Sequence, residues 1–106
     1  GNKTMKRYKN EGVITRWTEG TKALSYNGAL RTDGVRLWSY DLLIAVRARP
    51  GATTQTGLQL AVADFTAPSG NFKTVTTSTH VNAAKRCADI VVDPESFDQF
   101  VIDFTV

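Results

Sequence analysis

The stretch "RLWSYDLLIAVRA", residues 36–48, carries the strongest structural signal in the sequence. Its residues alternate between two faces at the two-residue period of a β-strand. One of these faces holds five aromatic and aliphatic side chains: Trp38, Tyr40, Leu42, Ile44 and Val46. The other face begins with Leu37, Ser39 and Asp41 and continues with Leu43 and Ala45. We therefore expect a central strand that is half exposed at its start and fully covered at its end. Trp38 and Tyr40 then belong to the core.

Short strands and tight turns are predicted before this stretch. "MKRYKN", residues 5–10, and "VITRW", residues 13–17, flank Glu11-Gly12, which we expect to be a hairpin turn. The first of the two is mostly polar, as is typical of an edge strand. Asn27-Gly28 and Asp33-Gly34 are dipeptides that favour tight turns.

After the central stretch, the sequence predicts a loop at 49–57 and a strand at "LQLAVADF", residues 58–65. "APSG", residues 67–70, is expected to be a turn, and "FKTVT", residues 72–76, a short strand. The oligomeric state stays open, although residues 58–65 could be the edge strand of a dimer.

The apolar period becomes helical near residue 77. Thr77 or Ser78 can be the helix N-cap, because its hydroxyl can accept hydrogen bonds from the free amides of the first turn. Val81, Ala84 and Ala88 then form one narrow apolar face. "DIVV", residues 89–92, is expected to be a brief extended link or strand.

A second helix is predicted to start with Asp93 as N-cap and Pro94 at the first helical position. An amphipathic stripe follows at helical spacing: Phe97, Phe100, Val101 and Phe104. The segment "FVIDFTV" is also β-prone, but the cap and the stripe agree on a helix.

These patterns together predict an α+β fold, with a small twisted, mostly antiparallel sheet and one or two C-terminal helices packed on one face. The 106 residues suit a single domain. Residues 1–4 are expected to be flexible or derived from a tag.

The charges are polarised along the chain. Residues 1–49 hold ten lysines and arginines (3, 6, 7, 9, 16, 22, 31, 36, 47, 49) against four acids (11, 19, 33, 41). Residues 50–106 hold three basic residues (73, 85, 86) against six acids (64, 89, 93, 95, 98, 103). A basic half can favour a polyanion or an acidic partner. The alternative is a solvated surface with some pairing between the halves.

The sequence predicts a cytoplasmic protein. No apolar run approaches the length of a membrane span, and the N-terminus has no signal-peptide pattern. The single cysteine cannot form an internal disulfide, which fits a reducing compartment.

His80 and Cys87 are the chain's only histidine and only cysteine. Seven residues apart on a helix, they share a face but lie about 10 Å apart along the axis, whereas a nucleophile and its base must lie within about 3 Å. We therefore expect Cys87 to be a small core residue and His80 a neutral, locally hydrogen-bonded side chain.

No catalytic residue, metal site or cofactor is assigned. A metal site would need carboxylates beside the one histidine and one cysteine, and the carboxylates show no clustered spacing. Asp93, Glu95 and Asp98 are interpreted as a cap and a solvated helix face.

The basic half also contains aromatic residues among its cations. A sheet that presents aromatic rings among cations can stack single-stranded bases. With Trp38 and Tyr40 expected in the core, the possible platforms are Tyr8, Trp17 and Tyr26. The candidate nucleic-acid-binding residues are Lys6, Arg7, Tyr8, Lys9, Arg16 and Trp17.

Two strings of the sequence resemble a group of small phage and prophage proteins of unknown function. That group has a Tyr-Ser-Tyr-type strand running into an apolar Ile-Ala segment, then Thr-Thr-Ser closely followed by His and a short helix. The resemblance covers residues 36–98, and the chain departs from it at Asp41-Leu42-Leu43 and in the long loop at 49–57. The matching positions are Trp38, Ser39, Tyr40, Ile44, Ala45, Thr76, Thr77, Ser78, His80 and Asn82.

The resemblance implies a viral setting and a small cytoplasmic accessory protein, and it implies no reaction. If the second string is structural, Thr77 or Ser78 caps the helix while His80 ties the cap to the preceding strand. We therefore predict that Thr77, Ser78 and His80 form a structural joint.

Our leading expectation is a non-enzymatic, phage-encoded binding protein that engages a host or viral protein in the host cytoplasm. The first alternative is a nucleic-acid-binding module that uses the basic N-terminal half. A third class is a small hydrolase or lyase that uses His80.

Overall fold

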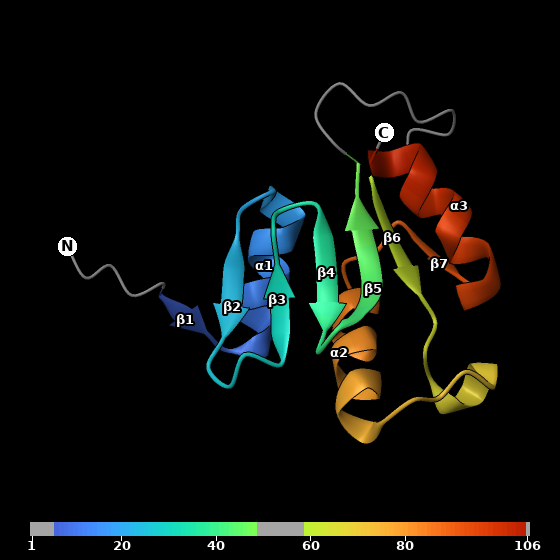
Figure 1. The fold of residues 1–106 in the computed structure, drawn as a ribbon, viewed down its shortest axis with the longest axis horizontal. Helices are drawn as coiled ribbons and strands as arrows, with labels where there is room; N and C mark the ends of the chain where they lie inside the picture. Colours follow the sequence, from blue (N-terminus) through green and yellow to red (C-terminus); the bar gives the residue numbers. More distant parts are fainter. Residues whose placement is uncertain (1–5, 49–58, 106) are drawn as a thin grey trace.

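The computed structural model describes residues 6–48 and 59–105 and, from residue 103 onward, the backbone only (Figure 1). The predicted loop at 49–57 and the predicted flexible start at 1–4 lie outside these described residues. The elements, in chain order, are β1 (Arg7–Tyr8), α1 (Asn10–Glu19), β2 (Ala23–Ser25), β3 (Leu30–Thr32), β4 (Arg36–Ser39), β5 (Leu42–Arg47), β6 (Leu60–Ala63), a short 3-10 helix (Ala67–Ser69), α2 (Val75–Lys85), β7 (Ile90–Val92) and α3 (Pro94–Thr105).

The sheet has seven strands whose spatial order follows their order in the chain. The outer pairs β1–β2 and β6–β7 are parallel, and the four pairs between them are antiparallel. The α+β class is confirmed, but the prediction of a mostly antiparallel sheet is wrong because the sheet is mixed.

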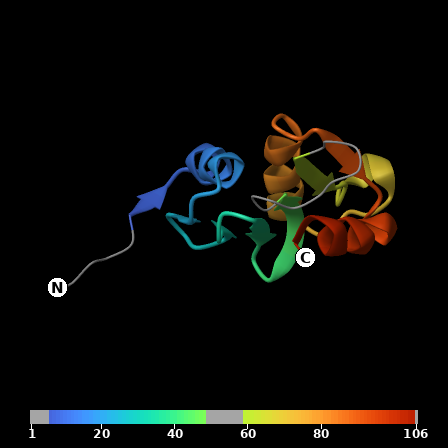
Figure 2. The ribbon, with the colours of Figure 1, turned by 90° about the horizontal axis from the view of Figure 1, so that it is seen from above.

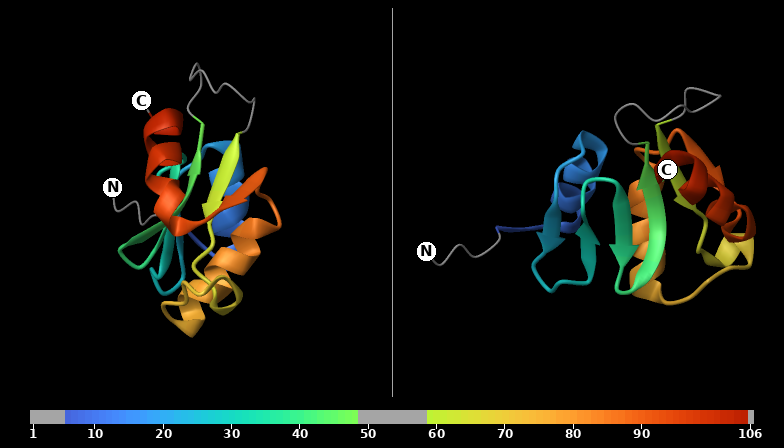
Figure 3. Two further views of the ribbon diagram at one scale, coloured as in Figure 1. Left: turned by 90° about the vertical axis from the view of Figure 1, so that its right-hand side faces the viewer. Right: turned by 45° about the horizontal axis from the view of Figure 1, so that its top comes forward.

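Helices cover both faces of the sheet (Figure 2). α1 connects β1 to β2, and α2 connects β6 to β7. Crossovers between parallel strands are right-handed, and these two run in the same direction across the sheet, so they place α1 and α2 on the same face. α3 lies on the opposite face (Figure 3). The two predicted C-terminal helices, α2 and α3, therefore lie on opposite faces and not on one.

Each face has its own hydrophobic core. Trp17 of α1 and Val81 of α2 pack with Leu30 and Leu37 of the sheet. On the other face, Phe97 of α3 packs with the second cluster of buried residues: Val46, Ala48, Ala61 and Ala63. Burying apolar area in this way is the main stabilisation of the fold.

The predicted hairpin turn at Glu11-Gly12 is wrong, because these residues lie inside α1. Val13, Ile14 and Trp17 are buried at helical spacing. The glycine is there for packing rather than for a turn, since a Cβ on Gly12 would come within 3.0 Å of the Cβ of Tyr8. The expected short first strand is confirmed at an edge of the sheet, as β1.

The predicted single strand at 36–48 is a hairpin of two strands. β4 and β5 are joined by the two-residue turn Tyr40-Asp41, where Tyr40 has a φ of 55°. Leu37 faces the core instead, so Trp38 is only partly buried and Tyr40 is 52% exposed. Their predicted place in the core is wrong, whereas the burial of Ile44 is confirmed.

The turns predicted at Asn27-Gly28 and Asp33-Gly34 are confirmed, and they join β2 to β3 and β3 to β4. The strand predicted at 58–65 is confirmed as β6, but it lies between β5 and β7 and so is no dimer edge. The strand predicted at 72–76 is wrong, because α2 already begins at Val75.

α2 starts about one turn earlier than predicted. Thr74 is its N-cap and accepts a 3.0 Å hydrogen bond from the amide of Thr77, so the predicted cap at Thr77 or Ser78 is wrong. The helix ends at Lys85, and Cys87 beyond it is exposed, which corrects its predicted place in the core.

The end of the chain forms β7 and α3, which confirms the predicted strand and second helix. Phe97 is buried, whereas Glu95 and Asp98 are exposed as expected. The capping role of Asp93 stays a prediction, and the side chain of Phe104 lies outside the described part. No helix in the described ranges is long and apolar enough to cross a membrane.

Candidate functional site

The basic and acidic halves of the sequence lie at opposite ends of the sheet, because the spatial order of the strands follows their order in the chain. Residues 6–48, which form β1 to β5 and α1, carry eight lysines and arginines (6, 7, 9, 16, 22, 31, 36, 47) against four acids. Residues 59–105, which form β6, β7, α2 and α3, carry three against six. A polyanion is therefore attracted to the β1–β4 end and repelled from the β7 end.

One face of the sheet at the basic end has no described helix on it. α3 packs on β5 and β6, and the same face of β2, β3 and β4 continues beyond it (Figure 2). Side chains alternate along a strand, so the residues next to the buried Ala23, Leu30 and Leu37 point to this face. We call Lys22, Leu24, Arg31 and Trp38 the open face.

The strand register aligns the open face as a row. Leu24 pairs with Arg31, and Arg31 pairs with Trp38. Arg7 on β1 continues the row at one end and Leu43 on β5 continues it at the other. Side chains directly opposite one another on adjacent strands interact, so the row is one continuous surface.

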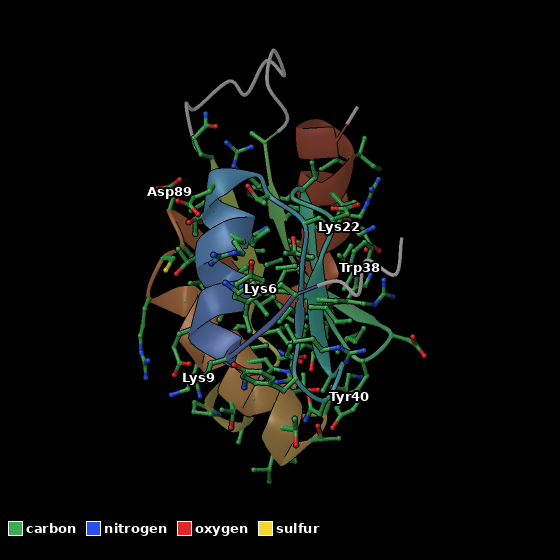
Figure 4. The ribbon with its side chains drawn as sticks, turned by 90° about the vertical axis from the view of Figure 1, so that its left-hand side faces the viewer. Lys6, Lys9, Lys22, Trp38, Tyr40 and Asp89 are labelled. Atoms are coloured by element: carbon green, nitrogen blue, oxygen red, sulfur yellow. The ribbon has the colours of Figure 1, made fainter. Side chains whose placement is uncertain are left out.

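The open face contains a stacked cation and aromatic ring. The guanidinium of Arg31 lies 4.3 Å from the centre of the Trp38 ring. Figure 4 shows Lys22 and Trp38 on the side of the sheet away from α1. Beside them is a hollow of about 270 Å³, whose lining is Lys22, Ala23, Leu24, Arg31, Thr32, Asp33 and Trp38.

Among the described residues, neither cation of the open face forms an ion pair with an acid. The described residues form two ion pairs, Arg36 with Asp33 at 3.2 Å and Lys85 with Asp64 at 2.6 Å. Lys22 and Arg31 belong to neither pair. Their charges therefore remain available to a ligand.

Asp33 neutralises Arg36 next to the open face. Partial burial raises the pKa of Asp33, but hydrogen bonds from the Arg36 and Val35 amides and the Arg36 guanidinium outweigh burial, so its pKa lies below the ordinary value. The carboxylate is thus ionised at neutral pH, and Arg36 adds little net charge there.

The structure separates the predicted nucleic-acid-binding residues. Trp17 is fully buried and donates a 3.1 Å hydrogen bond from its indole nitrogen to the carbonyl of Val35, so it cannot stack on a ligand. Tyr8 packs against the core, with the guanidinium of Arg16 3.8 Å and the ammonium of Lys6 5.6 Å from its ring centre. The surface predicted around Trp17 is therefore wrong.

The other predicted cations stay near the β1 edge. Arg7 donates a 3.2 Å hydrogen bond to the carbonyl of Tyr26, which fixes its guanidinium against the β2–β3 turn. Lys9 is exposed at the start of α1, and Tyr26 is 66% exposed. Together with Tyr8 they line a second hollow, of about 380 Å³, whose lining shares no residue with the hollow of the open face.

A buried polar network links β4 to α2. Ser39 Oγ lies 2.7 Å from His80 Nδ1 and 3.0 Å from Thr77 Oγ1. All three residues are at most 3% exposed. The network joins two segments 38 and 41 residues apart in the chain, so His80 ties α2 to β4 and not to the segment just before the helix.

The Ser39–His80 distance would suit a nucleophile and its base. However, Ser39 is fully buried and His80 is 2% exposed, so a substrate cannot reach the hydroxyl in this conformation. Burial also lowers the pKa of His80, which favours the neutral imidazole. The hydrogen bonds link α2 to β4, and the role of a structural joint stays a prediction. Within the described ranges, no group of three or more His, Cys, Asp or Glu side chains could hold a metal ion.

No family model, curated protein or solved structure matches the chain. The resemblance to small phage proteins therefore stays a prediction.

Sequence reasoning missed Trp38 as a surface residue. One signal was available: Arg36 shares the strand face of Trp38, and an arginine rarely lies in a core without a partner. Arg31 carried no such signal, because its place beside Trp38 depends on the β3–β4 register.

Proposed function

We propose that this protein is a non-enzymatic binding protein that holds an anionic macromolecule on its open face. The observation that carries the proposal is the row of Leu24, Arg31 and Trp38. In this row a cation that has no acidic partner among the described residues lies next to partly exposed apolar surface. Binding surfaces commonly combine arginine and aromatic side chains in this way.

The charge distribution supports the placement of this surface. The acidic β7 and α3 end would repel an anion while the β1–β4 end attracts it, so the encounter is oriented before contact. The burial of Ser39 and His80 supports binding rather than catalysis, because this hydroxyl–imidazole pair is enclosed.

The resemblance to small phage proteins extends the proposal to a biological setting. In that setting, the chain is an accessory protein made by a phage in the cytoplasm of its host. Its ligand is then a host or viral macromolecule with accessible negative charge.

Retention on immobilised heparin, a sulfated polysaccharide, tests the proposal. The double variant Lys22→Gln/Arg31→Gln is expected to elute at clearly lower salt than the wild type, because two cations of the binding surface are lost. The matched control is Lys73→Gln/Arg86→Gln, which removes the same charge from exposed residues outside the open face. Equal shifts for both variants, or a wild type that is not retained, would contradict the proposed surface.

A further inference from the structure

We infer that the macromolecule is a single-stranded nucleic acid, one of whose bases stacks on the Trp38–Arg31 pair. This inference rests on the proposed function and names its ligand. The cations of the open face alone would suit any polyanion, so the aromatic residues decide the class.

Trp38 gives the open face a planar platform. Trp38 is partly exposed, its ring is stacked with the Arg31 guanidinium at 4.3 Å, and it lines the hollow together with Leu24. Nucleic-acid bases stack on both aromatic rings and guanidinium planes. A sulfated sugar or an acidic side chain has no aromatic ring that could stack on Trp38.

The positive groups lie where a phosphate backbone would need them. Lys22 and Arg31 line the same hollow as Trp38, and neither is paired with an acid in the described part of the chain. A base on the Trp38–Arg31 pair thus brings its own phosphates close to two available cations. Counterion release from such contacts gives salt-dependent affinity.

Tyr40 provides a second, independent observation. It occupies the β4–β5 turn with a φ of 55°, a conformation that favours glycine, and its side chain is 52% exposed. Strained residues of this kind gather at functional sites. Tyr40 follows the last residue of β4 and lies two residues beyond Trp38. A nucleic-acid chain that runs along β4 would therefore pass both aromatic side chains (Figure 4).

The ligand must be single-stranded. In a duplex the base faces are covered by their neighbours in the stack, whereas an unpaired strand can turn its bases onto an aromatic ring. An open sheet face of three strands also offers no helix or ribbon shaped to enter a groove.

The test uses fluorescence anisotropy with labelled strands of about 12 nucleotides, at about 50 mM salt. The strands are a thymidine strand, an abasic strand of the same length and charge, and a duplex. We expect the thymidine strand to bind about 5- to 150-fold more tightly than the abasic strand, which is the effect of stacking one base. Binding should also quench the fluorescence of Trp38, whereas buried Trp17 should respond little.

Three variants locate the effect. Trp38→Leu should lower affinity for the thymidine strand about 5- to 150-fold and leave the abasic strand unchanged. Lys22→Gln should weaken both strands and reduce the salt slope by about 0.7. Tyr40→Gly suits the φ of its turn, so it should weaken thymidine binding without loss of folding.

The outcomes distinguish base stacking on Trp38 from anion binding on the open face. Equal binding of thymidine and abasic strands, or no effect of Trp38→Leu, would overturn stacking while leaving anion binding in place. Retention on heparin without binding to any of the labelled oligonucleotides would likewise overturn stacking and leave anion binding in place. Failure of both heparin and strand binding would overturn the proposed function as well.

Discussion

Replacing Gly34 with alanine is expected to lower the free energy of unfolding by about 3 kcal/mol. Gly34 has a φ of 98°, and a Cβ at this position would lie 2.5 Å from the carbonyl oxygen of Gly20 and 2.8 Å from its carbonyl carbon. Both contacts are with backbone, so the clash is relieved only by moving the end of α1 away from the β3–β4 turn. Chemical denaturation measures the loss.

Gly70→Ala is the matched control for this prediction. Gly70 has a similar φ of 80°, but a Cβ there meets nothing within 4 Å. Its substitution should therefore cost only the conformational strain, about 1 kcal/mol. Equal losses for the two variants would show that the close approach of Gly34 to Gly20 is not important for stability.

Lowering the pH from about 7 to about 5 is expected to destabilise the fold through His80. Burial lowers the pKa of His80 in the folded protein below its value near 6.5 in the unfolded chain. The unfolded chain therefore takes up the proton first as the pH falls. The contribution of His80 is complete above about pH 6.5 and decreases as the pH falls towards the folded pKa, by up to about 1.4 kcal/mol per pH unit.

His80→Asn tests this dependence. Asparagine can keep a hydrogen bond to Ser39 but does not titrate, and the chain has no other histidine. The variant should be less stable at pH 7 by about 1–3 kcal/mol because of lost packing and imperfect hydrogen bonding. Its stability should change less between about pH 7 and 5 than that of the wild type. An unchanged pH slope would mean that the network does not hold a neutral imidazole.

Local signals in the sequence predicted several elements correctly. Asn27-Gly28 and Asp33-Gly34 have turn chemistry that needs no tertiary information, and both are turns. Pro94 followed by the stripe that includes Phe97 gave α3. Each of these signals depends only on residues that are close together in the sequence, so it can be recognised without knowledge of the tertiary structure.

The wrong predictions concern segments whose secondary structure and burial depend on tertiary packing. Gly12 resembles a turn residue, and only the close approach of the Tyr8 Cβ explains a glycine inside α1. Residues 36–48 keep a period of two across Tyr40-Asp41, so the pattern cannot reveal that the chain reverses there. Because one continuous strand was predicted, Trp38 was placed in the core. The open face was therefore not recognised from the sequence.

Of the candidate site, the sequence predicted the positive charge but not the residues that form it. The basic N-terminal half and the acidic C-terminal half were evident from composition, and chain-ordered strands preserve this polarity in the fold. The row of Leu24, Arg31 and Trp38 depends on strand register, which no local pattern specifies here.

The most direct test of the open face as the binding surface is a titration of the isotope-labelled protein with a heparin oligosaccharide, followed by backbone amide chemical shifts. We predict that the largest shifts occur in β2, β3 and β4, at Leu24, Arg31 and Trp38, with the indole signal of Trp38 moving as well. Shifts confined to β7 and α3, with the β2–β4 signals unmoved, would contradict the assignment.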